Sequence, residues 1–147
     1  MGLQDEIHDQ LSEQARNMYP DAIAVGQLHW PDYSPVVGGS AQELVKLSKQ
    51  EKQGMQDRAG GFPAMVALVV TPTQLFVCGY KSARGGAKLM NDIKGWSRDQ
   101  LRLSVSHPYG TADYARIELM TVDRRIELDA ADATGVNAAF VQAISSG

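Results

Sequence analysis

Cysteine and long apolar runs are what this chain of 147 residues has least of. Its single cysteine, Cys78, excludes an internal disulfide and fits a reducing compartment, so we expect a cytoplasmic protein. The longest apolar runs, such as Met65–Val70, are far shorter than the roughly 20 residues of a membrane-spanning helix. The acidic, polar N-terminus also lacks the basic start and apolar core of a signal peptide. These absences predict a chain that neither spans a membrane nor depends on disulfides.

An overall excess of positive charge is also lacking, because the formal net charge is −3. Phosphate binding needs a basic face, so we expect no nucleic-acid partner. The charge is unevenly distributed, however. Residues 1–33 contain six acids and one base, for a net −5, whereas residues 81–102 contain six bases and two acids, for a net +4. The six bases are Lys81, Arg84, Lys88, Lys94, Arg98 and Arg102.

Catalytic and metal-binding motifs are missing as well. The three histidines, His8, His29 and His107, lack metal-ligand spacing with one another and with the cysteine. Cys78 lies in an apolar strand pattern, away from the cationic setting that a reactive thiol needs. The glycine-rich segment Gly79–Lys88 does not match the spacing of a phosphate-binding loop. We therefore expect a protein that is not an enzyme, without cofactor or metal.

Two apolar, β-rich runs are the most informative feature that is present. They flank a Thr-Pro-Thr-Gln turn and predict paired strands at about 64–71 and 74–81. Apolar residues occupy both the odd and the even positions of the first run. A strand with this pattern is expected to be covered on both faces.

Five further segments have strand signals, which brings the expected total to about seven. Ala22–Trp30 is predicted as the first strand. Apolar and polar residues alternate from Leu101 to Ser106 and again on either side of a turn near Asp123, which predicts a strand followed by a hairpin. Ile93–Ser97 is predicted as a short strand, and the basic, glycine-rich Ser82–Lys88 as a loop.

Three helices are predicted around these strands. An apolar residue at every fourth position marks an amphipathic helix at about 3–16. Ser40 and Glu43 have the spacing of a capping box, which predicts a helix over about 41–55. A third apolar stripe predicts a C-terminal helix that begins near Asp132–Thr134.

Carboxylates and tryptophans near these elements allow a functional and a structural interpretation. The acids near the last hairpin are Asp123, Glu127, Asp129 and Asp132. We interpret Asp132 as a helix cap and Asp123 as a turn residue, and favour a structural role for all four over a carboxylate site. Trp30 and Trp96 fit either the rim of a binding groove or the core.

The order of elements resembles a bacterial pleckstrin-homology-like (PH-like) domain. The residues behind the resemblance are MVALVVTPTQLFVCGYK, which is similar to the family's hairpin of two apolar strands joined through Thr-x-x-x-Leu, then LRLSVS, the hairpin ARIELMTVDRRIELD and the helix GVNAAFVQAI. The resemblance covers about Ala22 to Ile144. It implies an α+β, mainly β fold: a bent antiparallel sandwich of seven strands, with a C-terminal helix that closes one end.

Two features would be additions to the smallest versions of that fold. Residues 1–20 would be an N-terminal helical extension, and residues 21–147 a PH-like domain with a helical insertion at about 40–56. The resemblance implies a non-enzymatic scaffold. Eukaryotic members often bind phosphoinositides through a basic loop after the first strand, but residues 31–63 contain no compact basic cluster of that kind.

Two functional hypotheses follow. The first is a binding or assembly module that engages protein partners, including copies of itself, since the acidic N-terminal helix and the basic 81–102 segment would allow a symmetric contact. The second is a peripheral module that contacts anionic lipid, or another anionic ligand, through Lys81, Arg84 and Lys88. The two hypotheses differ in whether these basic side chains share one face of the molecule.

Overall fold

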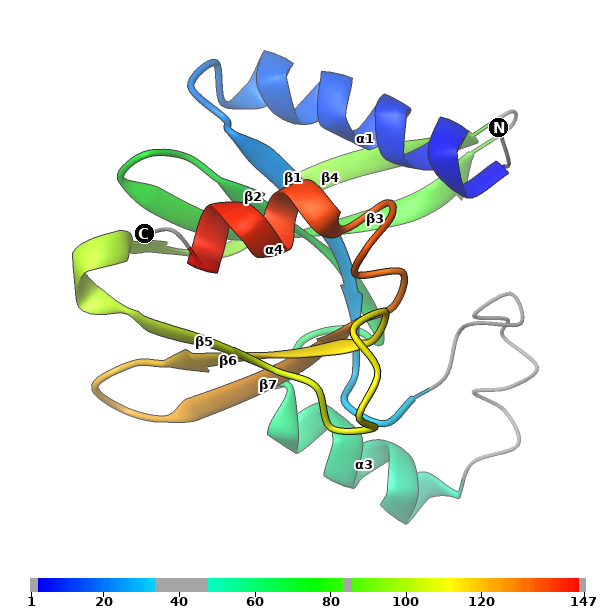
Figure 1. Ribbon diagram of the computed structural model, residues 1–147, viewed down its shortest axis with the longest axis vertical. Coiled ribbons are helices and arrows are strands. Elements are labelled where there is room, and N and C mark those ends of the chain that lie inside the picture. The colour runs from blue at the N-terminus through cyan, green and yellow to red at the C-terminus, as the bar shows by residue number, and fades with distance from the viewer. Residues whose placement is uncertain (1–2, 34–47, 84–85, 146–147) are drawn as a thin grey trace.

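The computed structural model describes residues 3–33, 48–83 and 86–145. Seven antiparallel strands form one sheet in the order β4-β3-β2-β1-β7-β6-β5 (Figure 1). The strands are β1 (Ala24–His29), β2 (Met65–Val70), β3 (Gln74–Ala83), β4 (Gly86–Ser97), β5 (Arg102–Ser106), β6 (Ala115–Met120) and β7 (Arg125–Ala130). The helices are α1 (Leu3–Met18), α3 (Lys49–Arg58) and α4 (Ala138–Ser145), with a short 3-10 turn, η1, at Arg98–Gln100. The α+β, mainly β class and the strand and helix order are therefore confirmed.

The sheet divides into two halves at β1. This strand pairs with β2 along its whole length but with β7 only at His29 and Asp129. Figure 1 shows the β2–β4 half and the β5–β7 half diverging from this junction, with α4 between them. The arrangement is sandwich-like, and the main core fills the space between the halves.

Asn137 closes the gap that this division opens in the hydrogen bonding of β1. Its side-chain oxygen accepts from the Gln27 N–H at 2.8 Å, and its amide nitrogen donates to the Gln27 carbonyl at 3.0 Å and to the Ala131 carbonyl at 2.7 Å. The buried Asn137 therefore replaces the neighbouring strand at Gln27.

Two apolar clusters cover the two faces of β2. Leu68 and its alternate neighbours pack in the main core with Phe140 of α4. Ala67 and Val69 pack in a second cluster with Leu11 and Ala15 of α1. The prediction that this strand is covered on both faces is confirmed.

Helix α1 covers the second cluster and also protects the outer edge of β4. Gln10 accepts a hydrogen bond from the Ala87 N–H at 2.9 Å. Gln14 donates to the Ala87 carbonyl at 2.9 Å and accepts from the Leu89 N–H at 2.7 Å. These side chains bond backbone groups that an edge strand would otherwise present to another chain.

The same contacts explain where the predicted loop is wrong. Ser82–Lys88 was expected to connect two strands, but β3 extends to Ala83 and β4 begins at Gly86. The predicted short strand Ile93–Ser97 is only the last part of β4. Helix α1 stabilises this long hairpin through tertiary contacts that local sequence does not reveal.

The helix boundaries also differ from the predictions. The expected start at Ser40 lies outside the described residues, and α3 runs from Lys49 to Arg58, beyond the predicted end at 55. Its capping residue is Ser48, which accepts from the Glu51 N–H at 3.0 Å and donates to the Glu51 carboxylate at 3.1 Å.

The C-terminal helix starts later than predicted, at Ala138. Asp132 has a positive φ of 50°, and its carboxylate accepts from the Val136 N–H at 3.0 Å. Asp132 was expected to cap the helix, but it organises a turn ahead of the helix start instead. Within the described part of the chain, no helix combines the length and the apolar character needed to cross a membrane.

Candidate functional site

Two of the three predicted ligand-contacting residues lie directly opposite each other. Lys81 on β3 pairs across the strands with Lys88 on β4, so both side chains project from the same face of the hairpin. Both residues are exposed, and neither has a salt bridge within the described part of the chain. Like charges placed opposite each other on a sheet repel. Arg84 lies outside the described residues.

Lys94 adds a third positive charge to this face. It pairs with Val77, which is four residues before Lys81 on β3, and strand side chains alternate, so Lys94 and Lys81 share a face. Its ammonium nitrogen lies 6.0 Å from the centre of the Trp96 ring, at the outer limit of a cation–π contact. Lys94 is also exposed and outside any salt bridge among the described residues.

The last two bases of the 81–102 segment lie elsewhere. Arg98 donates to the Thr71 carbonyl at 3.1 Å and to the Ala143 carbonyl at 3.4 Å, which holds it against α4. Arg102 begins β5, in the other half of the sheet. The positive charge of the segment therefore divides between a shared face on the β3–β4 hairpin and separate positions beyond it.

Two exposed apolar side chains lie among the three lysines. Met90 is 41% and Ile93 50% exposed. They occupy the two places where the β3–β4 register shifts, and a Cβ at Gly79 would lie 3.9 Å from both side chains. We call Lys81, Lys88, Met90, Ile93 and Lys94 the basic-apolar face.

The opposite side of the same hairpin is covered by α1, and its side chains have packing and structural roles. Cys78 is fully buried there, and burial raises the pKa of its thiol to about 11, so the thiol is a packing group at neutral pH. Tyr19 donates to Asp92 at 2.9 Å, which helps fix the end of α1 to β4.

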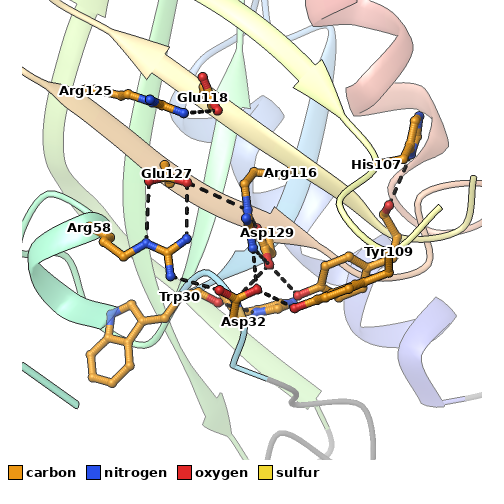
Figure 2. A network of polar contacts seen from close by, with 12 residues as sticks. Trp30, Asp32, Arg58, His107, Tyr109, Arg116, Glu118, Arg125, Glu127 and Asp129 are labelled. Atoms are coloured by element: carbon orange, nitrogen blue, oxygen red, sulfur yellow. Dashed lines mark hydrogen bonds and ion pairs between the residues drawn. The ribbon is translucent and has the colours of Figure 1, made fainter. Parts of the chain in front are cut away.

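A second concentration of polar side chains lies at the end of β1 and on the β6–β7 hairpin (Figure 2). We call it the Asp32–Asp129 cluster. Its members are Asp32, Arg58, Tyr109, Tyr114, Arg116, Glu127 and Asp129. They come from the β1 end, α3, the β5–β6 connection and the β6–β7 hairpin.

Asp129 is the buried centre of this cluster. Its carboxylate is inaccessible to solvent and accepts two hydrogen bonds from Arg116, at 2.8 and 3.1 Å. Tyr114 donates to it at 2.5 Å, and so does the Asp32 N–H at 2.9 Å. Burial, together with donation to Asp129, raises the pKa of Tyr114 well above its usual range. The buried charge is thus paired and fully hydrogen bonded.

Asp32 joins the cluster from the exposed side. Its carboxylate is bonded by Arg58 at 2.9 Å, by Arg116 at 2.5 Å and by Tyr109. Desolvation alone would raise the pKa of Asp32, but these three donors outweigh it and hold the pKa well below its usual range. Arg58 also bonds Glu127, at 3.2 Å. Because the charges of the Asp32–Asp129 cluster bond one another, we infer a structural role: the cluster holds the end of β1 and α3 to the β6–β7 hairpin.

His29 lies beside the Asp32–Asp129 cluster and is buried, with 3% of its surface exposed. Its Nδ1 bonds the Trp30 carbonyl at 2.8 Å, while Nε2 has no hydrogen-bond partner among the described residues. The rings of Tyr33 and Tyr114 flank it at 6.0 and 5.9 Å. Burial lowers the pKa of His29, so the folded protein holds its imidazole neutral.

The remaining candidates from the sequence are placed as follows. Trp30 is buried and donates to the Phe62 carbonyl at 2.8 Å, and Trp96 packs edge-on against the Phe62 ring, so both belong with the core. Asp123 lies in the β6–β7 turn, where its N–H bonds the Thr121 hydroxyl at 3.2 Å. The structural interpretation of these residues holds.

The sequence prediction missed the Asp32–Asp129 cluster, although part of the signal was present. The β6–β7 turn fixes a register in which Arg116 faces Asp129, so a hairpin drawn from the turn would have paired them. Asp32 and Arg58 carry no such signal, because they come from segments that meet only in the folded molecule.

The chain was compared with known proteins, and no protein-family model and no curated protein matches it. In the described part of the chain, no group of three or more histidine, cysteine, aspartate or glutamate side chains is arranged to hold a metal ion. The residues themselves therefore carry the functional argument.

Proposed function

We propose that this chain is a non-catalytic binding module, built on a PH-like scaffold, that engages an acidic protein partner through the basic-apolar face. The observation that supports this most is the placement of three lysines on one exposed face, with two of them directly opposite each other. Their mutual repulsion is relieved when an acidic surface approaches. In the Asp32–Asp129 cluster, by contrast, the charges already bond one another.

Met90 and Ile93 indicate the chemistry of the partner. Apolar contact at the centre with charged residues around it is typical of protein interfaces. A partner that fits would present two or three carboxylates around an exposed aliphatic side chain. We infer no catalytic role for the module, because the one thiol is buried and protonated.

The lipid hypothesis is the second candidate, and the same apolar pair favours it. Each lysine near an anionic membrane contributes about 1 kcal/mol, and an inserted methionine or isoleucine adds to this. The inositol-lipid loop found in eukaryotic PH-like proteins plays no part in this hypothesis.

Binding of a defined probe tests the proposal. The probe is a fluorescent peptide that alternates glutamate with leucine, and phosphatidylserine vesicles serve as a parallel probe for the lipid candidate. We expect Lys81→Gln/Lys88→Gln/Lys94→Gln to weaken peptide binding between about threefold and a hundredfold, since exposed charge pairs contribute about 0.2–1 kcal/mol each. Binding should also weaken with salt.

The matched control is Lys49→Gln/Lys52→Gln/Arg102→Gln, which changes the net charge equally but leaves the basic-apolar face intact. Equal weakening by both variants would mean that only net charge matters and would contradict the proposal. Binding to vesicles without binding to the peptide would replace it with the lipid candidate.

A further inference from the structure

Helix α1 presents an acidic stripe on its outer surface. Glu6, Asp9 and Glu13 follow one another at helical spacing, and all three are exposed. None of them has a salt bridge within the described part of the chain. The inner surface of the helix is occupied by its contacts with β4, so this stripe points away from the sheet.

The acidic stripe and the basic-apolar face lie on opposite sides of the same hairpin. Side chains that alternate with Lys81 and Lys88, such as Tyr80 and Leu89, pack towards α1, whereas the lysines project from the other face. Figure 1 shows α1 running across one side of β3 and β4. The α1 side of the hairpin is therefore acidic, and the opposite side is basic.

From this geometry we propose that the partner is a second copy of this chain, and that copies associate head to tail. The acidic stripe of one molecule faces the three lysines of the next. This inference rests on the proposed binding function of the basic-apolar face and names its occupant.

The opposite placement of the two surfaces decides the symmetry. In a two-fold dimer with both contacts formed, each molecule would have to present the stripe and the lysines to its partner at once. Surfaces that point in opposite directions cannot do this, so the contact is heterologous and generates rings or open chains of molecules. The sequence suggested a symmetric contact; the structure favours a head-to-tail contact instead.

Sedimentation of the free protein across a wide concentration range tests the inference. We expect the average mass to rise beyond that of a dimer with concentration and to fall with added salt. Glu6→Gln/Asp9→Asn/Glu13→Gln and Lys81→Gln/Lys88→Gln/Lys94→Gln should each weaken association at least tenfold. Mixed together, the two variants should form one-to-one pairs that do not grow, because each keeps one competent surface.

A wild-type protein that stays monomeric, or that stops at a dimer unaffected by either variant, would overturn the inference. The outcome is separable from that of the proposed function, because the acidic variant keeps all three lysines and should still bind the glutamate–leucine peptide. A wild-type protein that does not self-associate but still binds the peptide in a lysine-dependent way would keep the binding function and remove only the second copy as its partner.

Discussion

Individual side chains replace missing backbone partners at several points in this molecule. The clearest case is Asn137, which bonds both backbone groups of Gln27 where β1 leaves β7. Its role comes from topology: a central strand shared by two diverging half-sheets needs a substitute partner. The sequence does not predict this role of Asn137, because a lone asparagine ahead of a helix is typical of a cap.

Replacing Asn137 tests this role. We expect Asn137→Ala to lower the free energy of unfolding by about 2–4 kcal/mol, because three backbone groups, two of Gln27 and one of Ala131, lose their partner in a partly buried setting. Asn17→Ala, on the exposed surface of α1, should change it by less than about 0.5 kcal/mol. Urea unfolding of both variants measures the difference, and an equal effect would show that Asn137 is not a structural link.

His29 predicts a pH dependence of stability. Its pKa is lowered in the folded state by burial, so below the unfolded pKa of about 6.5 the unfolded chain binds a proton that the folded chain does not. Stability should therefore fall as pH drops from about 6.5, and this contribution should be absent above about pH 7.5. Asp32 does not contribute to this change, because its pKa is depressed in the folded state and it affects stability only below about pH 4.

Unfolding curves between pH 5 and 8 measure this effect. We expect His29→Gln, which keeps a donor for the Trp30 carbonyl, to flatten the pH dependence, and the exposed His107→Gln to leave it as in the wild type. An unchanged slope in His29→Gln would mean that another group takes up the proton.

At the scale of the elements, close packing between α4 and β1 depends on one glycine. A Cβ at Gly26 would lie 2.6 Å from Cγ of Phe140 and 2.8 Å from Cδ1 of Leu28, closer than carbon atoms pack. Any side chain at this position would push α4 away from the sheet.

Two glycine substitutions with opposite effects test this packing. We expect Gly26→Ala to destabilise the fold by about 1–3 kcal/mol through overpacking. Gly54→Ala should stabilise it by about 0.5–1 kcal/mol, because Gly54 lies inside α3 with nothing within 4 Å of an added Cβ. Thermal unfolding compares them, and a neutral Gly26→Ala would show that α4 shifts without cost.

The elements also show what could be predicted from sequence and why the rest could not. Alternation identified the strands from β5 to β7 because apolar and polar residues alternate in their sequences, and the apolar Leu103 and Val105 of β5 pack against the core. The extent of β4 was missed because its edge is bonded by Gln10 and Gln14 of α1, contacts that join residues more than 70 positions apart.

At the scale of the whole molecule, basic and acidic residues lie on opposite sides of the β3–β4 hairpin. The sequence could predict only part of this arrangement. The basic 81–102 segment was apparent from composition, and the hairpin brings Lys81 and Lys88 together. Arg98 and Arg102 lie away from that face, because the chain turns at η1 into the other half-sheet. The opposed acidic stripe could be assigned to a side only once the packing of α1 was known.

The most direct test of the account is a residue-resolved titration. Backbone amide resonances of the full chain would be followed by NMR while the glutamate–leucine peptide is added at low salt. We predict that the largest shifts fall on the amides of Lys81, Lys88 and Ile93, and that they disappear in Lys81→Gln/Lys88→Gln/Lys94→Gln. Shifts centred instead on the Asp32–Asp129 cluster, or an absence of shifts on the β3–β4 hairpin, would contradict the assignment of the binding face.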